Sequence, residues 1–525
     1  MNNLTYCFRI NSDERIGIGH VKRCIRIANH LKILGHKCIF FIDGKSNLEF
    51  FLKDFKVEYI YDKSEKFIDQ HEDAKIFLRK LKNKNYIVIL DDYRFDYVWE
   101  KIISTNNFKL TVIDDSETKK HYCDTYINYK PNLINPNNFN FSLIKNKSTK
   151  LLLGSKYAVI DCKYKVRKKK ILKKNFNVCF YMGGSGNYKF FDKVILKLIN
   201  FIPFTKKKIR FHIISGIACK NLNSLILLSK KYKFINIING KKKLDKIIHS
   251  MDLIVGSAGN IVYESSYYNI PSLFFETSKN QKNDLSNMEK IGHYFLLPIS
   301  EIKNVKKIAK LIFLMIKNYN RIYKLSSSKE VKIDNQGVTR IVKNITGMNY
   351  NEKNFNQKPN YSKLSDRFLF RKIKDSEINE YLNSRNLPIN RKVSVSIKKI
   401  NRLNHYIWWL STKRDSFVMM MNNYKIVYLY DETIKLKSKN YSLQGWFACT
   451  NKLGIKEILT ALNWHQKYMK IKGGIDLSFG IIKKGNKINF SKYLNWKLIQ
   501  SNSQEYEILK KICKVDKKYN YYSRY

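Results

Sequence analysis

The segment LTYCFRINSDERIGIGHVKRC, residues 4–24, decides the fold of the first half of this chain. Its apolar start predicts a buried strand over residues 4–10, and the residues that follow His20 have the periodicity of a helix. Between strand and helix, Gly17 and Gly19 allow a tight turn whose backbone can approach a ligand closely. A strand, a glycine turn and a helix in this order are typical of a parallel α/β sheet.

The same alternation continues along the chain and restarts near residue 176. It predicts two doubly wound, Rossmann-like domains, residues 1–160 and 161–345, so the fold class is α/β. Ligands of such sheets bind beyond the carboxyl ends of the strands, so we expect a site in the cleft between the two domains. Further strands are expected at 37–43, 86–92, 110–115, 176–186, 209–216, 234–240, 251–260 and 270–276.

The remainder of the chain differs in composition. Residues 346–365 are rich in asparagine and lysine and lack periodicity, which indicates a linker. Residues 366–525 mix helical and strand-like segments and are numerous enough for an independent α+β domain.

The net charge is +56, from 99 basic and 43 acidic residues. A charge of this size suits nucleic acid or an anionic surface. Here lysine is spread along the whole chain beside abundant asparagine, isoleucine and tyrosine, as AT-rich codons would produce. We therefore expect a solvated lysine surface and no nucleic-acid site, although the field would still attract an anionic substrate.

The 9 cysteines are dispersed without a C-x-x-C pair or a metal-ligand spacing, which predicts reduced thiols and no metal site. The N-terminal residues lack the pattern of a signal peptide, and no apolar run approaches the ~20 residues of a membrane span. The expectation is a cytoplasmic protein without a membrane span, and the sequence carries no information on its oligomeric state.

His20 stands where the first helix begins, next to N–H groups and a partial positive charge that suit a phosphate. The third glycine of a dinucleotide-binding motif is missing. Because histidine titrates near neutral pH, His20 is a candidate general base, and a capping or packing histidine is the alternative. Tyr93 follows the strand at 86–92 and is expected at the same edge of the sheet.

The second half contributes turns that could hold a nucleotide. N–H groups of these turns would meet a diphosphate, and Glu264, one turn into a helix, could bond ribose hydroxyls. The alternative for Glu264 is an ordinary first-turn glutamate that the helix dipole favours. The candidate residues are Gly183, Gly184 and Ser185 in MGGSGN, Ser257, Ala258 and Gly259 in GSAGNIVYE, and Asn280 and Gln281 in the loop TSKNQKND.

Residues 1 to about 345 resemble the nucleotide-sugar hydrolases of pseudaminic acid biosynthesis, which release UDP from UDP-2,4-diacetamido-2,4,6-trideoxy-β-L-altropyranose. These are related to spore-coat polysaccharide proteins and to glycosyltransferases of the two-Rossmann type, which implies a GT-B-like fold. The stretches that carry the resemblance are, in order, RIGIGHVKRC, DDY, VIDD, LLLGSKYAVI, MGGSG, GSAGNIVYE and NQ.

The resemblance implies that His20 activates or positions the attacking water and that Tyr93 and Asn280 line the same site. It implies that UDP is held by the turn at 256–260 with Glu264 and Gln281, and that hydrolysis needs neither a cofactor nor a metal. Ser257-Ala258 and Ser185-Gly186 depart from the residues usual in the family, which leaves the sugar open, including a legionaminic-type precursor.

Hydrolysis is chemically suited to such a site. UDP is a good leaving group, and helix N-termini and loop amides can stabilise the departing diphosphate. General-base help from His20 would be worth ~10²–10⁴ in rate.

Residues 366–525 are similar in element order to the acyl-CoA-dependent N-acetyltransferases, with a loop and a long helix at 450–469. The resemblance implies acetyl-CoA as acyl donor, its diphosphate on the loop at Asn451, Gly454 and Lys456, and a UDP-linked amino sugar as acceptor. Only Gly454 clearly matches the family's loop pattern, so a purely structural domain is the alternative.

Other functions stay open at this point. A glycosyltransferase that uses a UDP-sugar donor on the same scaffold would carry an apolar membrane-facing patch near its cleft. A protein that binds nucleic acid or an anionic polysaccharide would cluster basic and aromatic residues on one face, whereas here they are dispersed.

Overall fold

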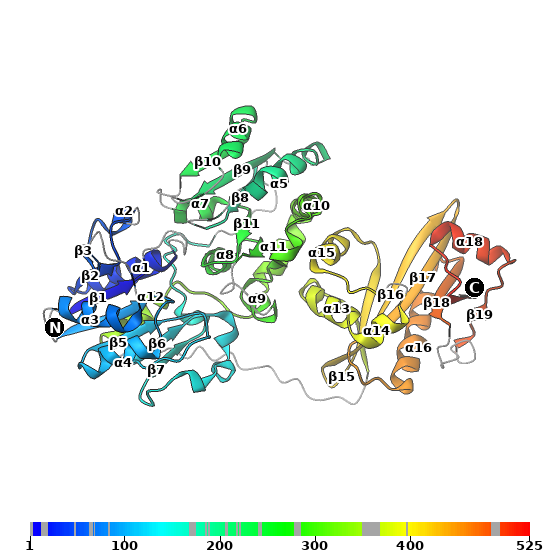
Figure 1. Ribbon diagram of the computed structural model, residues 1–525. Coiled ribbons are helices and arrows are strands. Elements are labelled where there is room, and N and C mark those ends of the chain that lie inside the picture. Colours follow the sequence, from blue (N-terminus) through cyan, green and yellow to red (C-terminus); the bar gives the residue numbers. More distant parts are fainter. Residues whose placement is uncertain are drawn as a thin grey trace. The chain divides into compact units, whose positions relative to one another are not determined.

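The first apolar run forms β1 (Thr5–Ile10), which lies inside a parallel sheet of 7 strands. This computed structural model describes residues 4–11, 19–46, 49–61, 67, 69–81, 85–166, 175–183, 186, 189–204, 208–216, 219, 222–239, 244–277, 285–348, 368–394, 397–484 and 494–524. The chain divides into two compact units, Met1–Phe355 and Asn356–Tyr525. Figure 1 draws the first unit in blue to green and the second in yellow to red.

The first sheet has the doubly wound order that its alternating strands and helices dictate. Its strands run, from edge to edge, β3 (Lys56–Tyr59), β2 (Lys37–Ile42), β1, β4 (Tyr86–Asp91), β5 (Lys109–Ile113), β6 (Thr125–Asn128) and β7 (Lys150–Leu153). Its helices are α1 (Gly19–Ile33), α2 (Glu49–Leu52), α3 (Gln70–Lys80) and α4 (Tyr97–Thr105). All neighbouring strands are parallel, so their carboxyl ends meet at one edge of the sheet.

The second sheet repeats this arrangement with 6 parallel strands. They run β10 (Ile235–Asn239), β9 (Lys208–Ser215), β8 (Asn175–Tyr181), β11 (Leu253–Ser257), β12 (Ser272–Glu276) and β13 (Phe295–Pro298). The helices are α5 (Lys189–Ile199), α6 (Asn223–Lys231), α7 (Leu244–Ser250), α8 (Ile261–Tyr268), α9 (Leu285–Gly292), α10 (Val305–Lys317), α11 (Tyr319–Ser327) and α12 (Gly337–Ile345). The two Rossmann-like sheets confirm the α/β prediction for the first half.

One hydrophobic core joins the two sheets of the first unit. It includes the buried side chains of Phe8 and Tyr129 from the first sheet and Tyr263 and Phe274 from the second. The last helix, α12, returns to the first sheet: Thr339 bonds His30 of α1 at 3.2 Å. Burial of this apolar surface, at ~25 cal/mol per Å², holds the two sheets together.

The second unit is built on a mixed sheet of 7 strands, as expected for an α+β domain. Their order is β14 (Leu369–Lys372), β15 (Asp415–Met421), β16 (Tyr424–Leu436), β17 (Lys439–Ala448), β18 (Leu477–Lys483), β20 (Tyr519–Arg524) and β19 (Lys497–Leu498). The helices are α13 (Ile378–Arg385), α14 (Pro388–Val393), α15 (Arg402–Ser411), α16 (Ile455–Lys472) and α18 (Gln504–Ile512). β17 and β18 pair in parallel, because the long helix α16 connects them, and the other pairings among the described residues of this sheet are antiparallel.

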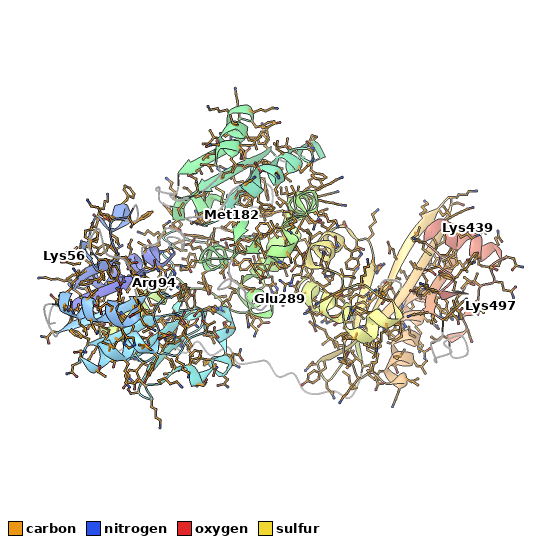
Figure 2. All side chains as sticks on the ribbon, in the orientation of Figure 1. Lys56, Arg94, Met182, Glu289, Lys439 and Lys497 are labelled. Carbon is orange, nitrogen blue, oxygen red and sulfur yellow. The ribbon has the colours of Figure 1, made fainter. Side chains whose placement is uncertain are left out.

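Lysines project from the described surface of both units, as the side chains in Figure 2 show. Lys56 lies on β3 and Lys497 on β19, which are edge strands of their sheets. A charged side chain on an edge strand opposes pairing with a second chain. Among the described residues no helix is long and apolar enough to cross a bilayer.

Candidate functional site

The carboxyl ends of β1, β4 and β5 gather the polar residues of the first sheet. His20 is the second residue of α1, and its side chain is only 6% exposed. Its Nδ1 lies in hydrogen-bonding contact with an oxygen of Asp91, the last residue of β4. Helix α1 follows β1, the neighbour of β4 in the sheet, which is why residues 71 positions apart meet here.

Arg23 binds both oxygens of the Asp91 carboxylate. Its Nε and Nη2 donate to the two oxygens of Asp91, and its Nη1 donates to Tyr129 at 3.3 Å. Burial alone would raise the pKa of Asp91, but Arg23 and His20 together hold that pKa well below its usual range. Asp91 is therefore a carboxylate at neutral pH. Because a carboxylate can only accept, a hydrogen bond from His20 to Asp91 requires the hydrogen on Nδ1, and in the neutral ring this leaves on Nε2 the lone pair that a general base needs.

Tyr93 joins this group, as predicted. Its ring meets the His20 ring edge-on, with the ring centroids 4.6 Å apart. Its hydroxyl donates to Asp115, which Arg23 also approaches at 3.5 Å. Arg23 and Asp115 were not predicted from the sequence. The i, i+3 spacing of His20 and Arg23, which places both on one helix face, was the available signal.

A second charged network supports the loop after β4. Arg9 is fully buried in β1 and donates to Asp73 at 2.5 Å and to Asp43 at 2.6 Å. Arg94, labelled in Figure 2, donates to Asp43 at 2.7 Å and to Asp92 at 2.5 Å. Since every carboxylate here has an arginine partner, the network can hold the strand ends in place without an unpaired buried charge.

The turns of the second sheet lie next to each other. β8 and β11 are neighbouring strands in which Tyr181 pairs with Gly256. Gly183, just after β8, has a φ of +82°, and a Cβ placed there would lie 3.8 Å from the Ser257 hydroxyl. Around Gly259 no described residue lies within 4 Å of such a Cβ. The structure thus brings together Gly183 and the Ser257–Gly259 turn, and the described residues leave open space beside the turn.

Glu264 of α8 reaches the helix that carries His20. Its Oε1 accepts from Arg26 of α1 at 2.7 Å, and the other end of that guanidinium donates to the Val159 carbonyl at 2.7 Å. Burial and the neighbouring Arg26 lower the pKa of Lys22 to about 8. Since one oxygen of Glu264 is engaged by Arg26, contact with a ribose is left to the other oxygen. Contact between Glu264 and a ribose remains a prediction.

Several predicted residues lie outside the described residues. They are Gly17, Gly184, Ser185, Asn280 and Gln281. Gly19 is the first residue of α1, and a Cβ there would meet no described residue within 4 Å. Within the described part of the chain, no group of three or more His, Cys, Asp and Glu side chains could hold a metal ion.

The second unit contains a cavity of ≈ 770 Å³ where β17 and β18 stop pairing. Their register runs from Tyr441 opposite Leu477 to Gln444 opposite Gly480, although β17 continues to Ala448 and β18 to Lys483. Past Gln444 the described residues form no further pairs between the two strands. The cavity is lined there by side chains of both strands and of α16, among them Trp446, Ile481 and Leu462.

The predicted CoA loop leads into α16. Gly454 precedes the first residue of the helix, and Asn451 and Lys456 are exposed beside it. Leu453 lines the cavity, whereas Asn451, Gly454 and Lys456 do not. The loop therefore lies at the rim of the cavity, where N–H groups of a helix start are available.

Comparison with known proteins finds weak relatives. No family model matches the chain. An uncharacterised protein of Methanocaldococcus jannaschii is 22% identical over 423 residues, 78% of each chain. The UDP-2,4-diacetamido-2,4,6-trideoxy-β-L-altropyranose hydrolase of Campylobacter jejuni is 23% identical over 288 residues, 54% of this chain and 96% of that enzyme. A Helicobacter pylori protein named for this hydrolase and a pseudaminic acid cytidylyltransferase is 23% identical over 281 residues, 53% of this chain and 45% of its own length.

Solved structures also align with the chain. The Acinetobacter baumannii MurG structure has a TM-score of 0.45 at 12% identity and covers 66% of this chain and 100% of its own. A Staphylococcus aureus MnaA–UDP co-structure has a TM-score of 0.45 at 12% identity and covers 66% and 97%.

Proposed function

We propose that residues 1–345 hydrolyse a UDP-linked diacetamido-trideoxy sugar at its anomeric carbon, releasing UDP and the free sugar. In more general terms, the first unit would be an enzyme that acts on a UDP-sugar. The proposal is supported by the 23% identity to the Campylobacter jejuni hydrolase, which extends over 96% of that enzyme. The observation that carries it is the His20–Asp91 pair at the carboxyl edge of the first sheet, on the helix that contacts α8.

The residues suggest how the reaction runs. Asp91 holds the Nδ1 hydrogen, so Nε2 of His20 can take a proton from water as the water oxygen bonds to the anomeric carbon. The sugar–oxygen bond to UDP breaks, and both bonding electrons leave with the diphosphate. The start of α8, just beyond the Ser257–Gly259 turn, would stabilise that charge through the partial positive charge of a helix N-terminus.

A direct assay tests this proposal. The full-length protein is incubated with the UDP-linked diacetamido sugar and no acceptor, and UDP and free sugar are measured. The hydrolysis rate of His20→Asn is expected to be ~10²–10⁴ times lower than that of the wild type, while UDP binding is retained. His71→Asn, at an exposed position on α3, is the matched control and should keep the wild-type rate. If UDP is released only when a sugar acceptor is added, the first unit is a glycosyltransferase instead.

We propose a second activity for residues 366–525, an acetyl-CoA-dependent N-acetyltransferase for a UDP-linked amino sugar. The supporting observation is the cavity at the end of the β17–β18 pairing. Unpaired strand backbone can bond an extended amide-containing chain as an added strand would, which suits the pantetheine arm of CoA. The helix start at Gly454 suits its diphosphate.

Acetyl transfer is tested with the same protein preparation. Acetyl-CoA and the UDP-linked amino sugar should give free CoA thiol and an acetylated sugar. Absence of both acetyl-CoA binding and turnover would favour a purely structural domain.

A further inference from the structure

Two arginines line the C-terminal cavity next to the point where β17 leaves β18. They are Arg385, the last residue of α13, and Arg414, just before β15. Both residues line this cavity, and the charge of Arg414 is close enough to add to the effect of burial, which lowers the pKa of Arg385. Two positive charges in one cavity repel each other unless negative groups neutralise them. Which carboxylates pair with the two arginines therefore decides whether the cavity can bind an anionic ligand.

Arg414 is partly neutralised and is held in a fixed position. Its Nη2 donates to Glu432 at 2.9 Å. Its guanidinium carbon lies 4.1 Å from the centroid of the Tyr430 ring and 5.5 Å from that of Trp408. Its Nε is buried and has no hydrogen-bond partner among the described residues. A guanidinium stacked in this way presents its remaining N–H groups in a defined direction.

Arg385 has no such carboxylate. Burial lowers its pKa, the phenols of Tyr430 and Tyr381 oppose that effect, and Arg414 adds to it. Among the described residues Arg385 forms no ion pair, and Arg414 forms one, with Glu432. This end of the cavity therefore keeps a positive charge that an anionic ligand would neutralise.

This arginine pair is separate from the predicted CoA loop. Tyr430, beneath Arg414, pairs with Gly445, the first residue of β17 beyond the β17–β18 register. The loop begins only after Ala448, three residues and ~10 Å further along the strand. The CoA diphosphate and the arginine pair would therefore occupy opposite ends of the cavity, with the acyl group between them.

We propose that Arg385 and Arg414 bind the diphosphate of the acceptor, so that the acceptor is a nucleoside-diphosphate-linked amine. This inference rests on the acyl transfer proposed for the second unit. The acceptor nitrogen would attack the thioester carbonyl, a C–N bond would form and the C–S bond would break. The sulfur keeps the bonding electrons, and the proton lost by nitrogen ends on the CoA thiol.

Calorimetric titration of the full-length protein with UDP tests the binding. The wild type should show one more UDP site than Arg385→Gln, whatever the first unit contributes. Guanidinium–phosphate contacts are strong, so the affinity of that site should fall about 10- to 100-fold in the variant. Because Arg385 pairs with no described carboxylate, its replacement leaves no acid unpaired and should not impair folding. Lys413→Gln, an exposed neighbour of Arg414, is the control and should keep the wild-type count.

The same variants separate the two proposals. If acetyl-CoA is consumed with a UDP-linked amine and Arg385→Gln raises only the acceptor KM, both proposals hold. If a UDP site is lost in Arg385→Gln but acetyl-CoA neither binds nor reacts, the diphosphate site holds and the acyl transfer fails. An unchanged number and affinity of UDP sites in Arg385→Gln overturns the inference, even if acetyl transfer is observed.

Discussion

Three buried histidines of this chain have different electrostatic surroundings, and these decide what each ring can do. His405 donates from Nε2 to the Ile378 carbonyl at 2.7 Å, and burial lowers its pKa to about 4, so it is a neutral ring. His121 lies between Glu100 and Asp114, at 2.6 and 3.1 Å. His20 contacts a single carboxylate that Arg23 already holds, which makes it the one of these three suited to exchange a proton with substrate.

Asp91→Asn tests whether this carboxylate positions His20. We expect kcat to fall about 10²- to 10⁴-fold with UDP affinity retained, because an amide no longer fixes the Nδ1 hydrogen. A wild-type kcat in this variant would contradict the positioning role.

The Asp91 experiment needs a stability control because Arg23 is buried. Removing one partner of a buried pair costs about 3–5 kcal/mol, so unfolding should be measured beside the rate. Asp54→Asn, at an exposed position, should change neither the rate nor the stability.

His121 predicts a pH dependence of stability. Although burial opposes its charge, the carboxylates of Asp114 and Glu100 raise the pKa of His121 to about 9. The raised pKa stabilises the fold fully below the unfolded value of about 6.5, and this contribution is lost as the pH rises through 9. In chemical denaturation at pH 6, the free energy of unfolding of His121→Gln should be lower than that of the wild type by on the order of 3 kcal/mol. This difference should shrink by pH 9.5, and a difference independent of pH would contradict the assignment.

At the scale of elements, the end of β11 and the turn after it combine a tightly packed glycine with an open one. A Cβ on Gly256, in β11, would lie 1.9 Å from the Tyr181 carbonyl oxygen of the neighbouring strand β8. A Cβ on Gly259 would meet no described residue within 4 Å. The first glycine is therefore required by strand packing, and the second leaves room where the proposal places the diphosphate.

Substitution of these two glycines should separate fold from binding. Gly256→Ala is expected to destabilise the first unit by about 1–3 kcal/mol, because backbone must shift to admit the methyl group. Gly259→Ala should leave the melting temperature nearly unchanged and weaken UDP binding. Thermal melts and UDP titration of both variants measure this. Equal loss of stability in the two variants would contradict the packing argument, and full UDP affinity in Gly259→Ala would contradict the binding role.

At the scale of the whole molecule, each buried core cluster of the described residues draws its members from one unit. The cluster of Phe8 and Tyr263 spans both sheets of the first unit, so these two sheets should unfold together. The clusters of the second unit surround residues such as Phe417 and Phe479. Two separate cooperative transitions are therefore the expectation for the full chain.

Acetyl-CoA should shift only one of these transitions. A ligand at 100 times its Kd stabilises the part that binds it by ~2.7 kcal/mol. Calorimetric scans with and without acetyl-CoA should move the transition of the second unit upward and leave that of the first unit in place. A shift of the first transition alone, or of neither, would contradict the proposed CoA site.

The strands that the sequence predicted are the long and strongly apolar ones. In the first unit, the strands it missed, β3, β6, β7 and β13, have 4 residues each, and three of them lie at sheet edges. β3 reads KVEY, in which one residue in two is charged. Short strands at an edge need fewer apolar side chains, so periodicity alone does not distinguish them from loops.

The sequence by itself determined the two parallel α/β halves, the mixed C-terminal domain and the candidacy of His20, because strand periodicity and a glycine turn before a helix are local properties. Only the tertiary structure decided the partners. His20 meets Asp91 across 71 residues, and Arg26 meets Glu264 across 238. Such pairs depend on which strands become neighbours and which helices face each other, and no local pattern records that choice.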